Sequence, residues 1–159
     1  MEKISTLLAR IQGLRVYVDT HIFVYFLERH ERYFDTVLPF FQLFDEGLSF
    51  ACTGDAAVAE TLFKPYQVDD VIRVSEFKAF FANDEFISVL PHTTKVFELA
   101  AELAPKRGMK LIDALHYATA VLAGCNFILT NDAGFASNSE IEVIYLQDLV
   151  EYACRAFPK

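Results

Sequence analysis

The sequence predicts a three-layer α/β/α sandwich in which helices cover both faces of a parallel β-sheet. Short apolar runs typical of buried strands alternate along the chain with longer segments of helical periodicity. The 159 residues are 53% hydrophobic and 23% charged, which suffices for one domain with a full core. We therefore expect a single domain over residues 1–159, of which 1–14 form an N-terminal extension.

The predicted strands are short and apolar. Val16–Val18 is too short for a helix and apolar enough to be buried on both faces. Asp19 and Thr20 end this run, and a segment with helical spacing follows at once. Further strands are predicted at residues 48–52, 86–90, 127–130 and 142–146. The first four strands, which helices separate, are expected to be parallel.

The predicted helices begin and end at typical boundary residues. Glycines at positions 13, 47, 108 and 124 stop four of them. Thr53-Gly54-Asp55 is a start signal for another helix, which Pro65 is expected to end. The predicted helices cover residues 1–14, 21–28, 33–46, 53–64, 68–81, 93–107, 111–123 and 148–156.

Cysteine usage and hydropathy indicate the compartment. The three cysteines are odd in number and lack the spacing of metal ligands, so we expect buried thiols in a reducing environment. The first ten residues carry no long apolar run behind a basic start. No apolar stretch approaches membrane-spanning length. We therefore expect a cytoplasmic protein without a membrane partner.

The net charge of −8 and the isoelectric point near 4.9 argue against a nucleic-acid partner, whose binders usually carry basic patches. Metal-dependent nucleases are an exception, because their metal-binding carboxylates add negative charge that only the ion offsets. The charge therefore lowers the expectation of a polynucleotide substrate without excluding one.

Four acidic residues stand out by position. Asp19 and Asp132 each follow a short apolar run, where a strand should end, whereas Glu60 and Asp113 lie within otherwise apolar helical patterns. An ionised acid is costly to bury alone, so such residues are usually paired or metal-bound. Oxygen ligands of this kind suit Mg²⁺ or Mn²⁺. Such an ion could activate water for attack on a phosphodiester.

Each of these acids also has a purely structural interpretation. Asp19 could cap the helix that follows it. Asp113 could stabilise the N-terminus of its own helix. Glu60 could pair with a lysine one turn on, and Asp132 could be an ordinary turn residue. Any one of these structural interpretations is reasonable alone, but we do not expect all four to hold together.

Four short motifs surround the acids. They are Val18-Asp19-Thr20-His21, Val58-Ala59-Glu60-Thr61-Leu62, Leu111-Ile112-Asp113-Ala114-Leu115-His116-Tyr117-Ala118-Thr119-Ala120, and Leu129-Thr130-Asn131-Asp132 with Phe135. In this order and at this spacing they resemble the PIN-domain ribonucleases, in particular the VapC-like toxins of bacterial toxin–antitoxin pairs. The resemblance runs from Arg15 to Leu146.

The resemblance implies a PIN-like α/β/α sandwich and a metal-dependent endoribonuclease with Mg²⁺ or Mn²⁺ as cofactor. It makes four acids the metal-binding and catalytic residues: Asp19, Glu60, Asp113 and Asp132. It makes Thr130 the catalytic-site hydroxyl that steadies them, and Thr20 a supporting neighbour. Gly134 stands where some members place a further acid. The substrate would be RNA, and the toxin branch implies an antitoxin protein as partner.

Other functions are weighed against this one. A phosphatase of the haloacid dehalogenase type needs an acid two residues after Asp19, where His21 stands. A PIN fold kept as a catalytically silent RNA- or protein-binding module usually lacks one or more of the acids, and all four are present. His21 and His116 are interpreted as hydrogen-bonded structural residues, the commoner role of a histidine on a helix face.

Two surfaces are expected to meet partners. Tyr33–Phe44 has more apolar residues than one helix face usually needs. We expect part of it to cover a second copy of the chain, in a homodimer, or an antitoxin helix; that all of it faces the core remains an equal alternative. A few cations are expected to contact RNA: Lys64, Lys106, Arg107 and Lys110.

Overall fold

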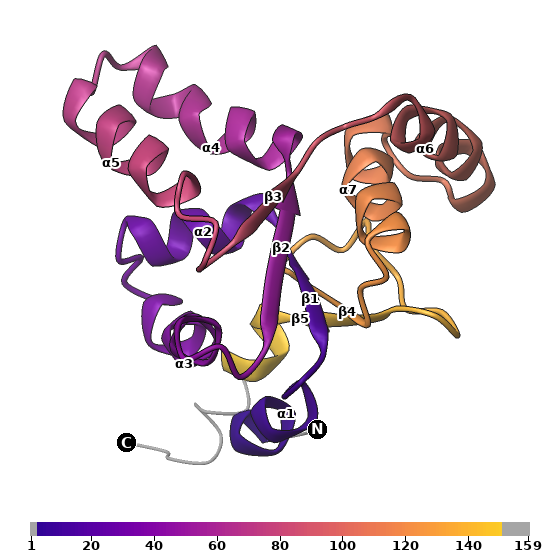
Figure 1. The fold of residues 1–159 in the computed structure, drawn as a ribbon, viewed down its shortest axis with the longest axis horizontal. Coiled ribbons are helices and arrows are strands. Elements are labelled where there is room, and N and C mark those ends of the chain that lie inside the picture. The colour runs from indigo at the N-terminus through magenta and orange to yellow at the C-terminus, as the bar shows by residue number, and fades with distance from the viewer. Residues whose placement is uncertain (1–2, 151–159) are drawn as a thin grey trace.

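The computed structural model describes residues 3–150 and contains a five-stranded sheet flanked by helices (Figure 1). The strands are β1 (Arg15–Val18), β2 (Phe50–Gly54), β3 (Ser88–Leu90), β4 (Phe127–Thr130) and β5 (Glu142–Tyr145). Their order across the sheet is β3-β2-β1-β4-β5, and each neighbouring pair is parallel. The predicted α/β/α sandwich with a parallel sheet is confirmed.

The helices alternate with the strands as predicted. They are α1 (Ile4–Arg10), α2 (Thr20–Leu27), α3 (Phe34–Asp45), α4 (Asp55–Gln67), α5 (Val71–Phe81), α6 (Thr94–Arg107) and α7 (Leu111–Leu122). Residues 146–150 are also helical, and the rest of the predicted closing helix lies outside the described residues. None of the helices within residues 3–150 has the length and apolar character needed to cross a lipid bilayer.

Several boundaries differ from the prediction by a few residues, among them the end of α1 at Arg10 and the start of α5 at Val71, and three of the differences have local reasons. α4 continues through Pro65, because a proline in the last turn removes one backbone donor and leaves the earlier bonds intact. β2 begins at residue 50, since the Leu48 N–H bonds to the Leu43 carbonyl in the turn after α3. β3 is shorter than predicted because residues 86 and 87 close a turn onto the Asn83 carbonyl.

Alternation along β1 divides the core into two layers. Val16 and Val18 pack in the cluster that contains buried residues of α1, α2 and α3. Tyr17 packs in the opposite cluster, with Tyr117 of α7. All three β1 side chains are 0% exposed. Helices thus cover both faces of the sheet, which explains why its central strand is apolar at consecutive positions.

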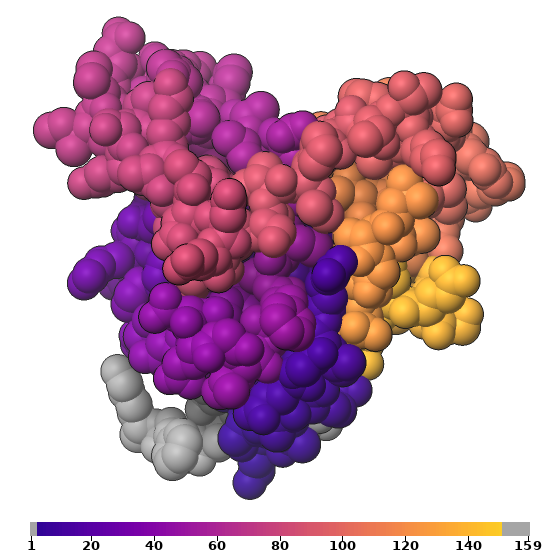
Figure 2. All heavy atoms as spheres, viewed as in Figure 1, coloured from indigo at the N-terminus to yellow at the C-terminus, as the bar shows by residue number. Residues whose placement is uncertain are grey.

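The strand order reverses beside β1. The chain passes outward from β1 through β2 to β3, then returns to place β4 on the other side of β1. In open parallel sheets, ligands bind in the crevice outside the carboxyl ends of the strands at such a switch point. The α4–α5 hairpin and the α6–α7 pair project from the body of the fold (Figure 1), and Figure 2 shows a notch between these two projections.

Candidate functional site

Asp19 and Thr130 meet at the switch point. Asp19 follows β1, and its N–H bonds to the Leu129 carbonyl of β4 at 3.0 Å. The Thr130 hydroxyl donates to Asp19 Oδ2 at 2.6 Å, and the Thr20 N–H donates to Oδ1 at 2.8 Å. Asp19 is 4% exposed and Thr130 is fully buried. Asp19 is therefore both the N-cap of α2 and a buried carboxylate at the carboxyl edge of the sheet.

Asp132 and Asp113 both lie close to Gly134. The Asp132 N–H donates to Thr130 Oγ1 at 3.0 Å, and Asp132 Oδ1 accepts the Gly134 N–H at 2.7 Å. A methyl group on Gly134 would lie 3.1 Å from Asp132 Oδ1 and 3.4 Å from Asp113 Oδ2. The missing side chain at Gly134 thus leaves room for the carboxylates of Asp132, which follows β4, and of Asp113 on α7.

The carboxylates of Asp132 and Asp19 act electrostatically on Asp113. Burial raises the pKa of Asp113, and the carboxylates of Asp132 and Asp19 raise it further. Nearby like charges disfavour the ionised form of a carboxyl group. Segments far apart in the sequence therefore contribute to one acidic centre.

Glu60 reaches the same region from α4. The Thr20 hydroxyl donates to Glu60 Oε1 at 3.1 Å, and His116 Nε2 lies 2.6 Å from the same oxygen. The hydrogen bond from His116 lowers the pKa of Glu60, whose side chain remains 41% exposed. Among residues 3–150, the hydrogen-bond partners of Glu60 are Thr20 and His116 rather than the lysine one turn on.

His116 is the residue whose place in the site the sequence reasoning missed. Its ring is 2% exposed, and its Nδ1 lies 2.7 Å from the Tyr17 hydroxyl. Burial would lower the pKa of His116, but its bond to Glu60 and the nearby Asp19 raise the pKa above its ordinary value. His116 follows Asp113 by three positions on α7, a spacing that places both on one helix face and could have drawn attention to it.

The residues fit a hydrated divalent cation. All four acids offer oxygen donors, which Mg²⁺ and Mn²⁺ prefer. Within the described part of the chain, no three Asp, Glu, His or Cys side chains lie close enough together to enclose an ion directly. Mg²⁺ usually retains several waters and takes one or two carboxylates, so an open centre of this kind is compatible with it. A cation would also offset the repulsion that raises the pKa of Asp113.

The parallel α/β/α sandwich with acidic residues at its switch point is the arrangement that the four sequence motifs predicted for a PIN domain. The PIN domain family model matches residues 16–141. The chain belongs to the PIN domain family, as its four motifs predicted. The comparison with curated proteins finds no significant match.

Solved structures with this fold include toxin–antitoxin proteins. A toxin–antitoxin complex from Klebsiella pneumoniae aligns with a TM-score of 0.61 at 16% identity, over 80% of this chain and 95% of that chain. VapC20 of Mycobacterium tuberculosis, a sarcin-ricin-loop-cleaving toxin, gives 0.58 at 16% identity, over 79% and 91%. VapBC2 from Rickettsia felis, bound to a promoter DNA fragment, gives 0.60 at 15% identity, over 83% and 98%. At such identities the likeness is one of fold.

Proposed function

We propose that the protein is a divalent-metal-dependent endoribonuclease that hydrolyses RNA phosphodiester bonds. The observation that carries this proposal is the gathering of acids at the switch point of a PIN-domain chain. Asp113 and Asp132 both lie beside Gly134, although burial and then repulsion by Asp132 raise the pKa of Asp113. A catalytically silent binding module has no need to keep like charges together at a cost in stability.

The proposed roles follow from the contacts. Four acids would hold Mg²⁺ or Mn²⁺: Asp19, Glu60, Asp113 and Asp132. When bound, the ion would stabilise charge on the phosphate and lower the pKa of an attacking water. Thr130 donates to Asp19 Oδ2 and accepts from the Asp132 backbone through the same hydroxyl, which supports its place in the proposed catalytic site. Thr20 connects Asp19 to Glu60.

We assign this nuclease to the toxin of a toxin–antitoxin pair, with an antitoxin as its protein partner. The support is the fold shared with toxin–antitoxin proteins of three bacteria. An adjacent reading frame for a small DNA-binding protein would distinguish a toxin from a housekeeping nuclease. The cytoplasm is the proposed location. Cys52 and Cys125 are free thiols whose sulfurs lie 3.2 Å apart, and thiols so close together are expected to stay reduced only in a reducing compartment.

We propose that a homodimer forms through α4 and α5 and not through residues Tyr33–Phe44, the Phe-rich segment. Most apolar residues of that segment are buried in the core of the single chain: Val37, Phe40, Phe41, Leu43 and Phe44. The α4–α5 hairpin leaves large apolar side chains in solvent, with Phe63 67%, Val71 77% and Ile72 73% exposed. Large apolar side chains exposed on neighbouring helices are a feature of protein interfaces.

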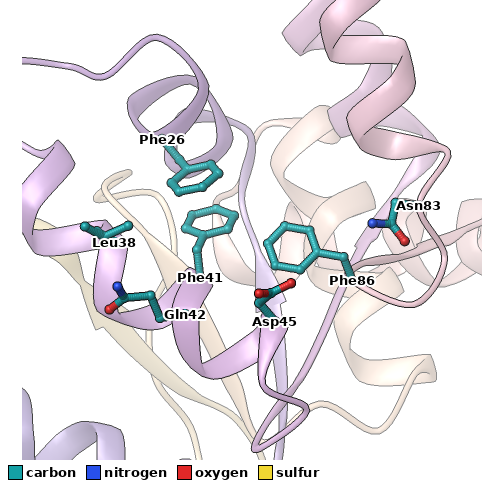
Figure 3. Close-up of a pocket in the computed structure, with 7 residues that line it drawn as sticks. All are labelled: Phe26, Leu38, Phe41, Gln42, Asp45, Asn83 and Phe86. Atoms are coloured by element: carbon teal, nitrogen blue, oxygen red, sulfur yellow. The ribbon is translucent and has the colours of Figure 1, made fainter.

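The Phe-rich segment retains one candidate docking place for an antitoxin side chain. Phe26, Leu38, Phe41 and Phe86 are among the residues that line a pocket of about 280 Å³ (Figure 3). Phe26 and Phe41 stack with ring centroids 3.9 Å apart, and Leu38 is half-buried beside them. An apolar side chain from an antitoxin helix would suit such a lining.

Cleavage of a panel of structured RNAs tests the proposed activity. We expect cleavage with Mg²⁺ or Mn²⁺, none in chelator, and none by Asp132→Asn in any condition. Asp84→Asn is the matched control, because Asp84 is an exposed acid in the turn before β3. Wild-type cleavage in chelator, or cleavage by Asp132→Asn at the wild-type rate, would contradict the proposal.

A further inference from the structure

A chain of hydrogen bonds runs from the buried sheet to the rim of the acidic centre. The Tyr17 hydroxyl of β1 lies 2.7 Å from His116 Nδ1, and His116 Nε2 on α7 lies 2.6 Å from Glu60 Oε1 on α4. Tyr17 is 0% and His116 2% exposed, whereas the Glu60 side chain is 41% exposed. A flexible carboxylate in solvent is thereby tied to two groups that cannot move independently of the core.

We infer that His116 is a positioning residue that fixes the orientation of the Glu60 carboxylate. The inference rests on the proposed function for its purpose, which is to present Glu60 to a cation. Glu60 Oε1 accepts from both His116 and Thr20, whereas Oε2 has no hydrogen-bond partner within residues 3–150. One oxygen is therefore held by the protein, and the other is left for a ligand.

The direction of these bonds follows from Glu60. An ionised carboxylate can only accept, so the proton in the 2.6 Å bond to Glu60 Oε1 belongs to His116 Nε2. In a neutral ring Nδ1 then carries no proton and accepts from the Tyr17 hydroxyl. In a charged ring both nitrogens carry protons, and Nε2 still donates to Glu60. The orientation of Glu60 is therefore the same in both protonation states of His116.

Glu60 needs such a support more than Asp19 does. Asp19 has a short side chain, and each of its oxygens accepts a hydrogen bond from a group buried beside it. Glu60 has an additional rotatable bond, and without His116 its support among residues 3–150 would be the 3.1 Å bond from Thr20. Hydrogen bonds to metal-binding side chains commonly change metal affinity by about 10–100-fold when removed.

Calorimetric titration of the full chain with Mg²⁺ is one arm of the test. We expect His116→Leu to weaken Mg²⁺ binding by roughly 10–100-fold, and His116→Gln, whose amide can donate from near the Nε2 position, to restore most of it. Tyr17→Phe should give an intermediate loss and covers the case in which His116→Leu fails to fold. Thr119→Val is the control, because Thr119 is buried on the same helix and bonds to Leu115 and His92.

The second arm needs no metal. In ¹⁵N-labelled wild type we expect ring-nitrogen shifts that show His116 protonated at Nε2, and the same in Tyr17→Phe, where the Glu60 carboxylate still accepts from Nε2. A wild-type ring with a bare Nε2, or a folded His116→Leu that binds Mg²⁺ as tightly as wild type, would overturn the inference. If the wild type binds no Mg²⁺ and cleaves no RNA, the proposed function fails, and the tautomer of His116 then decides its positioning role alone.

Discussion

Asp113 is the acid of the candidate site whose ionised form is disfavoured by its surroundings. Its pKa is raised by burial and then by Asp132, so the metal-free protein keeps repelling charges together. We expect Asp113→Asn and Asp19→Asn to leave the metal-free protein as stable as wild type, or more so. Asn is as good as Asp at the N-cap that Asp19 occupies, so the cap is kept. Both variants should lose metal-dependent cleavage.

Thermal melts with Mg²⁺ and with chelator measure this prediction. Mg²⁺ should raise the wild-type melting temperature, since a ligand of the native state at 100 times its dissociation constant stabilises by about 2.7 kcal/mol. The two variants should lose most of that response, whereas the exposed Asp84→Asn should keep it. If either variant melts well below wild type in chelator and still cleaves RNA, that aspartate is structural.

At this scale the motifs predicted where the acids lie but not what orients them. All four acids were selected because burying a charge is costly. That cost applies fully to Asp19, which is 4% exposed, but only weakly to Glu60, whose side chain is 41% exposed. The contact between His116 and Glu60 joins residues 56 positions apart. No local pattern encodes such a contact, because it arises only when α7 packs beside α4.

The helices also show what the sequence alone could not predict. Periodicity identified the apolar face of α3 but could not tell how much of the molecule packs on it. Phe26, Phe80 and Phe86 all surround Phe41 in the core, with ring centroids between 3.9 and 6.3 Å away. A Phe41 variant would therefore report folding, at a cost of about 3–5 kcal/mol for Phe41→Ala, and not association.

The dimer proposal is tested on α5. We expect sedimentation of the wild type as a dimer and of Ile72→Asp as a monomer, because a charge on the apolar face must be desolvated at an interface. The unfolding free energy of the single chain should change by no more than about 0.5 kcal/mol, since Ile72 is 73% exposed. Leu122→Asp is the control, a change of the same kind at an apolar α7 residue that is 50% exposed. A monomeric wild type would exclude the dimer.

For the whole molecule, the net charge limits how the proposed RNA substrate could be held. Of the cations expected to contact RNA, Lys106 pairs with Glu102, and Arg107 donates to the Tyr117 hydroxyl while its guanidinium lies over that ring. Lys64 and Lys110 then remain as the expected phosphate contacts. With a net charge of −8, we expect affinity to depend weakly on salt. Two phosphate contacts to a single strand give a logarithmic slope of roughly −1.4.

This slope is measured with an uncleavable RNA in chelator over a series of salt concentrations. Lys64→Gln should flatten it, whereas Lys3→Gln, far along the chain from the acids, should not. A slope several times steeper would reveal a basic groove that neither the sequence nor the charge pairs indicate.

The fold class could be predicted because the alternation of short apolar runs with helical segments admits few arrangements. The strand order could not, since nothing local in 127–130 says that it pairs with β1 rather than β3. The registers Val16 with Phe127 and Tyr17 with Ile128 depend on side-chain packing between distant segments. That pairing also sets the switch point, and so it determines where the acids gather.

The central position of β1 has a consequence for synthesis of the chain. Asp19 and Thr130, which bond across the switch point, are 111 residues apart. At about 5–20 residues per second, roughly 6–22 s separate their appearance at the ribosome. During that interval the nascent chain holds β1 and β2 without β4, so Asp113 and Asp132 have no sheet edge on which to meet Asp19. The proposed active site is therefore completed only after the final strands have been synthesised.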